Sequence, residues 1–140
     1  MAPSQIGSIE FAAERFGTQL VVVLGHSQCG AVLATLEALE SPNSARSSNL
    51  LSIVDRIRPA VEPLFASATR PSADELISSA VKANIRASVE QLNRGSRILQ
   101  GLMDKGELTI VGAEYSLETG VVDVFDGLSL PGAEQVAAIT

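Results

Sequence analysis

The sequence contains few residues of the types that form disulfides or aromatic cores. Its 140 residues include one cysteine, one histidine and no tryptophan, and aromatic residues make up only 4%. A single cysteine excludes an intrachain disulfide, so the reducing cytoplasm is the expected location. With 46% hydrophobic residues and so few rings, the core must be built from aliphatic side chains.

Basic residues are also scarce. The chain has 10 lysines and arginines against 16 acidic residues, which gives a formal net charge of -6 and a pI near 4.7. Nucleic acids and anionic membranes both favour partners with clustered positive charge. We also expect no signal peptide, and the sequence has no apolar run long enough to span a bilayer. We therefore expect neither a nucleic-acid partner nor a membrane partner.

The length of the chain favours one domain. A chain of 140 residues can bury a single hydrophobic core, and a division into two domains is not expected. No internal repeat and no glycine-rich phosphate loop is present. We therefore interpret residues 1–140 as one domain, in which residues 127–140, with their weak pattern, form a mobile tail or a docking arm.

One stretch near the N-terminus carries both the histidine and the cysteine. Leu20–Leu24 is a run of five aliphatic residues, three of them β-branched, and predicts a strand buried on both faces, as in a parallel sheet. Gly25 ends this run, and Ala31–Glu40 has the spacing of a helix. His26 and Cys29 therefore lie at the turn from strand to helix. In an α/β sheet this is the carboxyl edge, where ligands bind.

The chemistry of this turn is metal binding or thiolate chemistry. Imidazole nitrogen and thiolate sulfur are both good zinc ligands, and the start of the following helix favours the thiolate of Cys29. Spacing alone leaves an alternative open, in which His26 is merely solvated and Cys29 is a buried structural residue. Ser27 is not the nucleophile of a hydrolase elbow, because its neighbours are wrong and the chain has no second histidine.

Periodicity and capping signals predict the remaining elements. Proline inside a helix removes a hydrogen-bond donor and clashes with the preceding turn, so we expect Pro59 to divide the segment Leu50–Leu64 into two short helices. The other expected helices are 8–16 with Gly17 as its stop, a long helix that follows the capping box Ser72–Glu75, and 96–105 with Gly106 as its stop. The expected strands are Leu108–Ala113 and Val121–Asp126, an antiparallel pair joined by a turn at 118–120.

Three segments of the chain resemble the β-class carbonic anhydrases, in the same order along the sequence. They are Gly7–Ala12, Val21–Val32 and Ile110–Gly120. The resemblance implies a three-layer α/β fold with a mainly parallel sheet and a zinc lyase that interconverts carbon dioxide and bicarbonate. It also implies that His26 and Cys29 are two of the zinc ligands.

The chain also departs from this family. The family has an upstream Cys-x-Asp-Ser-Arg motif that supplies another cysteine ligand and an Asp-Arg pair, and this sequence lacks it. The chain resembles the C-terminal part of the enzyme, so we expect an incomplete, truncated fold without its first two strands. Glu10 and Glu114 could each add an oxygen ligand, although no spacing places either at the site. We expect a lone chain to be inactive and its zinc to be absent or labile.

The loss of two strands would leave the edge of Leu20–Leu24 open to another chain. We therefore expect a homo-oligomer, a dimer or larger, because an apolar unpaired edge pairs readily. Two functions stay open: part of a carbonic anhydrase that acts on carbon dioxide and bicarbonate once a missing segment completes it, or a non-catalytic oligomeric or metal-binding module. In the second case His26 and Cys29 from two chains could form a closed Cys2His2 zinc site.

Overall fold

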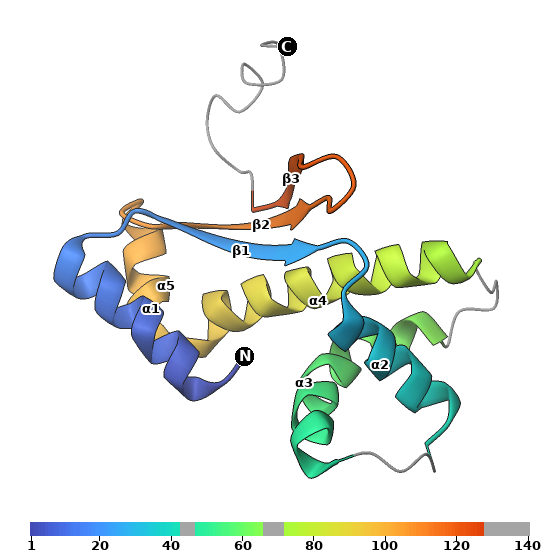
Figure 1. The fold of residues 1–140 in the computed structure, drawn as a ribbon. Helices are drawn as coiled ribbons and strands as arrows, with labels where there is room; N and C mark the ends of the chain where they lie inside the picture. The colour runs from blue at the N-terminus through green and yellow to red at the C-terminus, as the bar shows by residue number, and fades with distance from the viewer. Residues whose placement is uncertain (43–46, 66–71, 128–140) are drawn as a thin grey trace.

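The computed structural model describes residues 1–42, 47–65 and 72–127 (Figure 1). Apart from Gly127, the expected tail lies outside these residues. Within them, no helix is long and apolar enough to cross a membrane. The helices are α1 (Pro3–Phe16), α2 (Gly30–Glu40), α3 (Ser48–Phe65), α4 (Ala73–Gly95) and α5 (Arg97–Asp104). The strands are β1 (Leu20–His26), β2 (Thr109–Tyr115) and β3 (Val122–Asp126).

The three strands form one sheet in the order β1-β2-β3. β1 and β2 are parallel and pair along their whole length, from Leu20 with Thr109 to His26 with Tyr115. β3 runs antiparallel to β2, which confirms the expected hairpin. The mixed α/β class is confirmed, and β1 lies at the outer edge of the described sheet.

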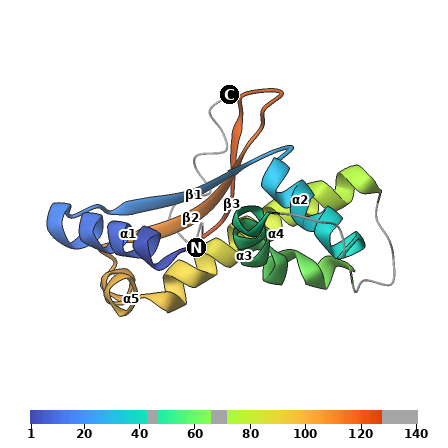
Figure 2. The ribbon, with the colours of Figure 1, turned by 60° about the horizontal axis from the view of Figure 1, so that its bottom comes forward.

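The described helices lie on one side of this sheet (Figures 1 and 2). Helix α4 runs under both β1 and β2, and a buried cluster joins Ala13 of α1, Leu92 of α4 and Leu99 of α5 to Ile110 of β2. Val21 and Val23 of β1 point to the same side and pack against this cluster. The sheet is therefore covered by helices on the face that these side chains occupy.

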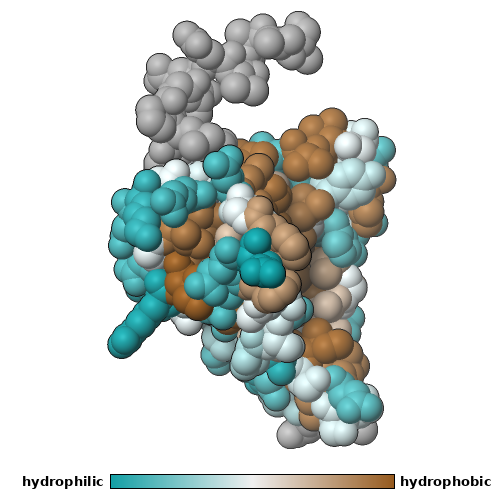
Figure 3. Space-filling model, turned by 90° about the vertical axis from the view of Figure 1, so that its left-hand side faces the viewer, coloured by the Kyte–Doolittle hydropathy of each residue, from teal (hydrophilic) through white to brown (hydrophobic). Residues whose placement is uncertain are grey.

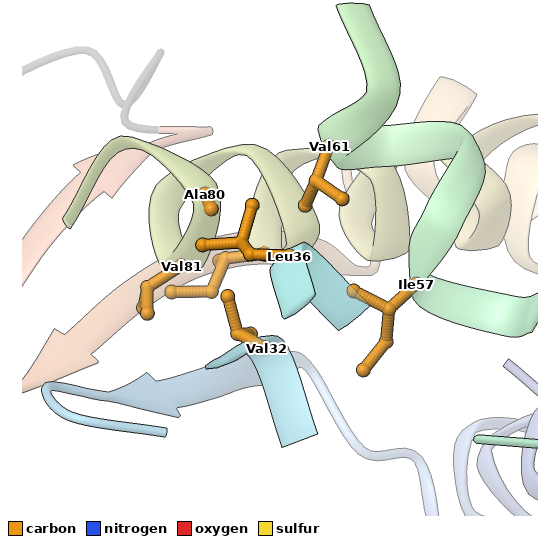
Figure 4. Packing of buried hydrophobic residues seen from close by; sticks show 7 residues of the cluster. Val32, Leu36, Ile57, Val61, Ala80 and Val81 are labelled. Atoms are coloured by element: carbon orange, nitrogen blue, oxygen red, sulfur yellow. The ribbon is translucent and has the colours of Figure 1, made fainter. Parts of the chain in front are cut away.

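A second cluster joins α2, α3 and α4 beside the carboxyl end of β1 (Figure 4). Its buried members are Val32, Leu36, Ile57, Val61, Ala80, Val81 and Ile85. In the part of the chain that the structure describes, every buried apolar side chain is aliphatic. The expectation of an aliphatic core is confirmed.

Helix α3 is continuous, so the prediction of two short helices on either side of Pro59 was wrong. Pro59 and Pro63 both lie inside Ser48–Phe65. Val54 and Val61, which lie before and after Pro59, are fully buried, whereas Pro59 itself is exposed. Packing on both sides of the proline stabilises the helix, and on the exposed side water can satisfy the carbonyl that proline leaves unbonded.

The prediction that β1 is buried on both faces was also wrong. Leu20, Val22 and Leu24 are 55%, 46% and 56% exposed, and they alternate with the half-buried Val21 and Val23. The aliphatic run indicates strand structure, but only one face of the strand packs against helices in the described residues. β1 therefore presents an apolar face as well as an unpaired edge.

Apolar side chains also reach the surface at the end of the molecule where α1 leads into β1 (Figure 3). Phe11 and Phe16 of α1 are exposed and pack edge to face, with their ring centroids 5.6 Å apart. The packing of the two rings on each other covers little of either. This end of the molecule is thus less polar than the acidic composition alone indicates.

The capping box expected at the start of α4 is present. The hydroxyl of Ser72 accepts from the backbone N–H of Glu75 at 3.4 Å, and the Ser72 hydroxyl and N–H both donate to the carboxylate of Glu75. These bonds, the one from the side chain first, lower the pKa of Glu75 below its ordinary value of 4.5. The charged carboxylate therefore stabilises the folded state.

This lowered pKa predicts a pH-dependent effect of Glu75→Gln. The variant should have a lower free energy of unfolding than the native protein at neutral pH, and the difference should shrink as the pH falls through 4.5 and below. Urea unfolding at several pH values measures it. Asp74→Asn removes the same charge from the same turn but leaves the hydrogen bonds between Ser72 and Glu75 in place. An equal pH dependence in that variant would contradict the explanation.

Candidate metal-binding site

Two glycines, Gly25 of β1 and Gly112 of β2, let the sheet lie close to α4. A Cβ atom on Gly25 would lie 2.6 Å from Cδ1 and 2.7 Å from Cγ1 of Ile85, and one on Gly112 would lie 3.0 Å from Cγ2 of the same side chain. Ile85 is 2% exposed and thus has little room to move. The residue before His26 must therefore be glycine for the strand and the helix to approach this closely.

Gly25→Ala is accordingly expected to destabilise the protein by about 1–3 kcal/mol, because the added methyl group overpacks a filled core. Thermal and urea unfolding measure the loss. Gly30→Ala is the matched control, since a Cβ at Gly30 has no neighbour within 4 Å. Ile85→Val removes the clashing Cδ1 and should recover part of the loss in the double variant. If the effects of the two substitutions on the free energy of unfolding are simply additive, this explanation is contradicted.

His26 ends β1 on the face opposite α4, and its side chain is exposed. Its Nδ1 lies 2.9 Å from the carbonyl oxygen of Ser27. A carbonyl can only accept, so this bond requires the hydrogen on Nδ1 and leaves the lone pair of Nε2 free. This is the arrangement in which a neutral imidazole can bind a metal ion through Nε2.

Cys29 is the N-cap residue of α2 and is half-buried. Its carbonyl accepts the N–H of Leu33 at 3.0 Å, whereas its side chain makes no capping hydrogen bond. The side chain packs against the core cluster of α2, α3 and α4. The expectation that Gly25 ends the strand was wrong, because β1 continues through it to His26. His26 and Cys29 thus lie on either side of the turn from strand to helix; their role as ligands stays a prediction.

Between them, Gln28 has a φ of 55°, in the left-handed region that non-glycine residues seldom adopt. Its side-chain amide donates to Glu118 Oε1 at 3.2 Å. Because backbone strain of this kind persists only where surrounding contacts impose it, the loop has a defined conformation. No spacing or motif in the sequence indicates this contact with Glu118.

Nitrogen and sulfur donors of this kind fit zinc, but their number does not complete a site. Among the described residues, no group of three or more His, Cys, Asp or Glu side chains could hold a metal ion. Glu10 accepts a hydrogen bond from Ser96 where α4 meets α5, and Glu114 lies 3.8 Å from the ammonium of Lys82. Neither glutamate adds an oxygen ligand beside His26 and Cys29.

Lys82 and Arg86 of α4 both lie beside an aromatic ring of β3. The Lys82 ammonium and the Arg86 guanidinium lie 5.7 Å and 5.1 Å from the ring centroid of Phe125 in β3. Such contacts favour a cation over an aromatic face. They attach β3 to α4, and sequence spacing could not reveal them because Phe125 lies on another element.

A pocket of about 530 Å³ opens beside the loop on the side of α4. Ser27 and Gln28 form part of its wall, Ile77 and Val81 of α4 form another part, and Glu114 lies on its sheet side. It is therefore a mixed polar and apolar hollow at the carboxyl ends of β1 and β2, where α/β folds bind ligands.

The sequence has close similarity to known proteins. The model of a protein family described as carbonic anhydrase matches residues 2–122. A carbonic anhydrase of Mycolicibacterium smegmatis is 38% identical over 120 residues, which are 85% of this chain and 55% of that protein. Carbonic anhydrase 2 of Mycobacterium tuberculosis is 30% identical over 129 residues, 92% of this chain and 59% of that protein. This chain thus spans little more than half the length of these relatives.

Solved structures that resemble this chain are carbonic anhydrases as well. A β-carbonic anhydrase of Coccomyxa, in complex with acetazolamide, superposes with a TM-score of 0.71 at 27% identity, over 86% of this chain and 52% of that one. A β-carbonic anhydrase of Aspergillus fumigatus gives a TM-score of 0.74 at 23% identity, over 92% and 59%. The second is evidence for the fold alone. Together they confirm the expected α/β fold and its partial coverage. Of the three expected layers, the described residues form two, the sheet and the helices on one of its faces (Figure 1).

Proposed function

This chain belongs to the carbonic anhydrase family, in its β class, and we propose that it is the part of such an enzyme that carries two of the zinc ligands, His26 and Cys29. The proposed reaction of the completed enzyme is the reversible hydration of carbon dioxide to bicarbonate. The observation that supports this most directly is the free Nε2 of His26 at the same strand-to-helix turn as the thiol of Cys29.

A catalytic zinc ion in an enzyme of this kind needs three protein ligands and a water molecule, whose pKa it lowers to about 7; carbonic anhydrase is the standard example. In this chain, His26 would bind through Nε2, with the Ser27 carbonyl holding its Nδ1 hydrogen. Cys29 would bind through its sulfur at the start of α2. The remaining ligand must come from residues other than these two, so we assign no proton-transfer step to this chain alone.

We also propose that the chain forms a homo-oligomer. The outer edge of β1 and its face of Leu20, Val22 and Leu24 support this, because an apolar edge strand without charge or proline pairs readily. One similar structure, from Sordaria macrospora, is described as a tetrameric β-carbonic anhydrase, with a TM-score of 0.70 and 16% identity over 89% of this chain and 61% of that one. A cytoplasmic location stays a prediction from the sequence.

The second candidate function is a non-catalytic module, favoured by the incomplete ligand set of the described residues. A zinc ion bridging two chains is not favoured by pairing at β1. Two copies of one edge strand related by a twofold axis normally pair antiparallel, which puts their His26 residues at opposite ends. Over a strand of 7 residues these ends lie about 20 Å apart. Zinc ligands lie about 2.0–2.3 Å from the ion, so one ion cannot reach both.

Zinc content and oligomer mass, measured on the same sample, test the proposal. We expect a homo-oligomer with much less than one zinc per chain after purification, and zinc uptake that Cys29→Ser abolishes. Native mass spectrometry with elemental analysis gives both quantities. A protein that never takes up zinc, at any metal concentration, would contradict the ligand assignment. One tightly held zinc per two chains, with two sulfur and two nitrogen ligands by X-ray absorption, would favour the bridging module.

A further inference from the structure

All three polar groups of Ser27 have hydrogen-bond partners. Its N–H donates to the carbonyl of Tyr115 at 2.9 Å, and its hydroxyl oxygen accepts the N–H of Leu117 at 2.9 Å. Its carbonyl accepts the Nδ1 hydrogen of His26, also at 2.9 Å. Ser27 therefore connects the imidazole of His26 to the chain that leaves β2.

The segment that bonds to the Ser27 hydroxyl, residues 116–121, is a turn with hydrogen bonds of its own. The N–H of Ser116 donates to the carbonyl of Val121, and the N–H of Gly120 donates to the carbonyl of Ser116, both at 2.9 Å. The hydroxyl of Ser116 also accepts the N–H of Thr119 at 3.2 Å. Gly120 has a φ of 74°, which glycine adopts without strain. The turn at 116–121 therefore holds its shape through its own hydrogen bonds.

We propose that Ser27 is a positioning residue: through its hydroxyl, the turn at 116–121 orients the imidazole of His26 so that Nδ1 carries the hydrogen and Nε2 is free. This inference rests on the proposed function, because the orientation serves a purpose only if Nε2 binds a metal ion. The bond from Gln28 to Glu118 is a second link between the same loop and the same turn.

In a neutral imidazole either nitrogen can carry the hydrogen, and the partner of one nitrogen decides which tautomer is populated. Here the deciding partner is a main-chain carbonyl, whose position depends on how Ser27 is held. Partners of this kind behind a metal ligand typically change metal affinity by about 10- to 100-fold when they are altered.

The tautomer of His26 is the direct readout, and the chain has only one histidine, so its ring ¹⁵N signals in NMR have no overlap from another. The measurement is made without metal, at a pH well above the ordinary imidazole pKa of about 6.5. We expect Nδ1 to be protonated in the native chain. In Ser27→Ala we expect a mixture of both tautomers and roughly fivefold to tenfold faster exchange of the Leu117 amide.

Ser27→Thr keeps the hydroxyl and should restore the native tautomer and the slow exchange. Ser8→Ala is the matched control, because it removes a serine hydroxyl bonded to the Ser4 carbonyl on α1, away from the site. If Ser27→Ala does not fold, Ser116→Ala loosens the turn instead and should change the tautomer in the same direction. A native His26 protonated at Nε2, or a tautomer unchanged in the folded variants, would overturn the inference.

Zinc titration in competition with a chromophoric chelator separates this inference from the proposed function. If the native chain takes up zinc, Ser27→Ala should bind it about 10- to 100-fold more weakly, and Ser27→Thr should bind it as the native chain does. Equal affinities in all three would overturn the positioning of a ligand. If the native chain takes up no zinc while the tautomer shifts as expected, the positioning stands and the proposed ligand role of His26 fails.

Discussion

Carbon dioxide hydration in the presence of the 140-residue chain is expected to proceed at the uncatalysed rate of the buffer, with or without added zinc. The described residues hold no group of three side chains that could bind the metal, and the chain has only one cysteine. Two ligands would hold zinc only weakly, because catalytic zinc sites in proteins use three protein ligands and keep one position for water.

A stopped-flow assay with a pH indicator measures the rate. The full-length relative from Mycolicibacterium smegmatis, assayed in parallel, shows that the conditions support catalysis by a related enzyme. Turnover that depends on zinc and is abolished by Cys29→Ser would contradict the prediction, because it would mean that another copy or another residue completes the site. A zinc-dependent rate that Cys29→Ser leaves unchanged would instead come from the metal in solution.

Val22→Lys should dissociate the proposed oligomer while the chain stays folded. Val22 is 46% exposed on the face of β1 that no described helix covers, so lysine can reach water in the free chain. In an assembly that covers this face, the ammonium would be buried without a partner, at a cost of about 3 kcal/mol or more. That cost corresponds to roughly 100-fold weaker association.

Sedimentation velocity gives the mass, and circular dichroism gives the melting temperature. Ile53→Lys is the matched control: Ile53 is also 46% exposed, but it lies on α3, away from the sheet. We expect it to leave the mass unchanged. A native chain that is monomeric at micromolar concentration would contradict the proposed assembly, and a Val22→Lys variant with the native mass would place the interface elsewhere.

Local signals in the sequence predicted most of the elements. Gly17, expected to end the first helix, has a φ of 66° and donates its N–H to the carbonyl of Ala13. The box of Ser72 and Glu75 begins α4, as expected. These features depend on residues within one turn of each other, so the sequence contains all the information they need.

Features that depend on distant residues could not be predicted in the same way. The apolar run Leu20–Leu24 indicates a strand, but whether a second face is covered depends on elements elsewhere in the chain or in another chain. The hydrogen bond between Ser27 and Leu117 joins residues whose spacing carries no signal, and a serine in a loop has no feature that indicates such a bond. The candidate ligands could be identified because the chain has one histidine and one cysteine. Nothing in the sequence distinguishes Ser27, the residue proposed to orient His26, from other serines.

The pairing of β1 with β2 has a consequence for how the protein folds. Leu20 pairs with Thr109, so helices α2, α3, α4 and α5 all lie between the two strands along the chain. The entropy lost on closing so long a loop must be met before any contact between the strands forms, and domains with many such non-local contacts fold slowly. The helices should therefore appear before the sheet. The loop between His26 and Cys29 forms its hydrogen bonds to Tyr115, Leu117 and Glu118 only when β2 and its following turn dock, so it should be among the last parts of the molecule to reach its native conformation.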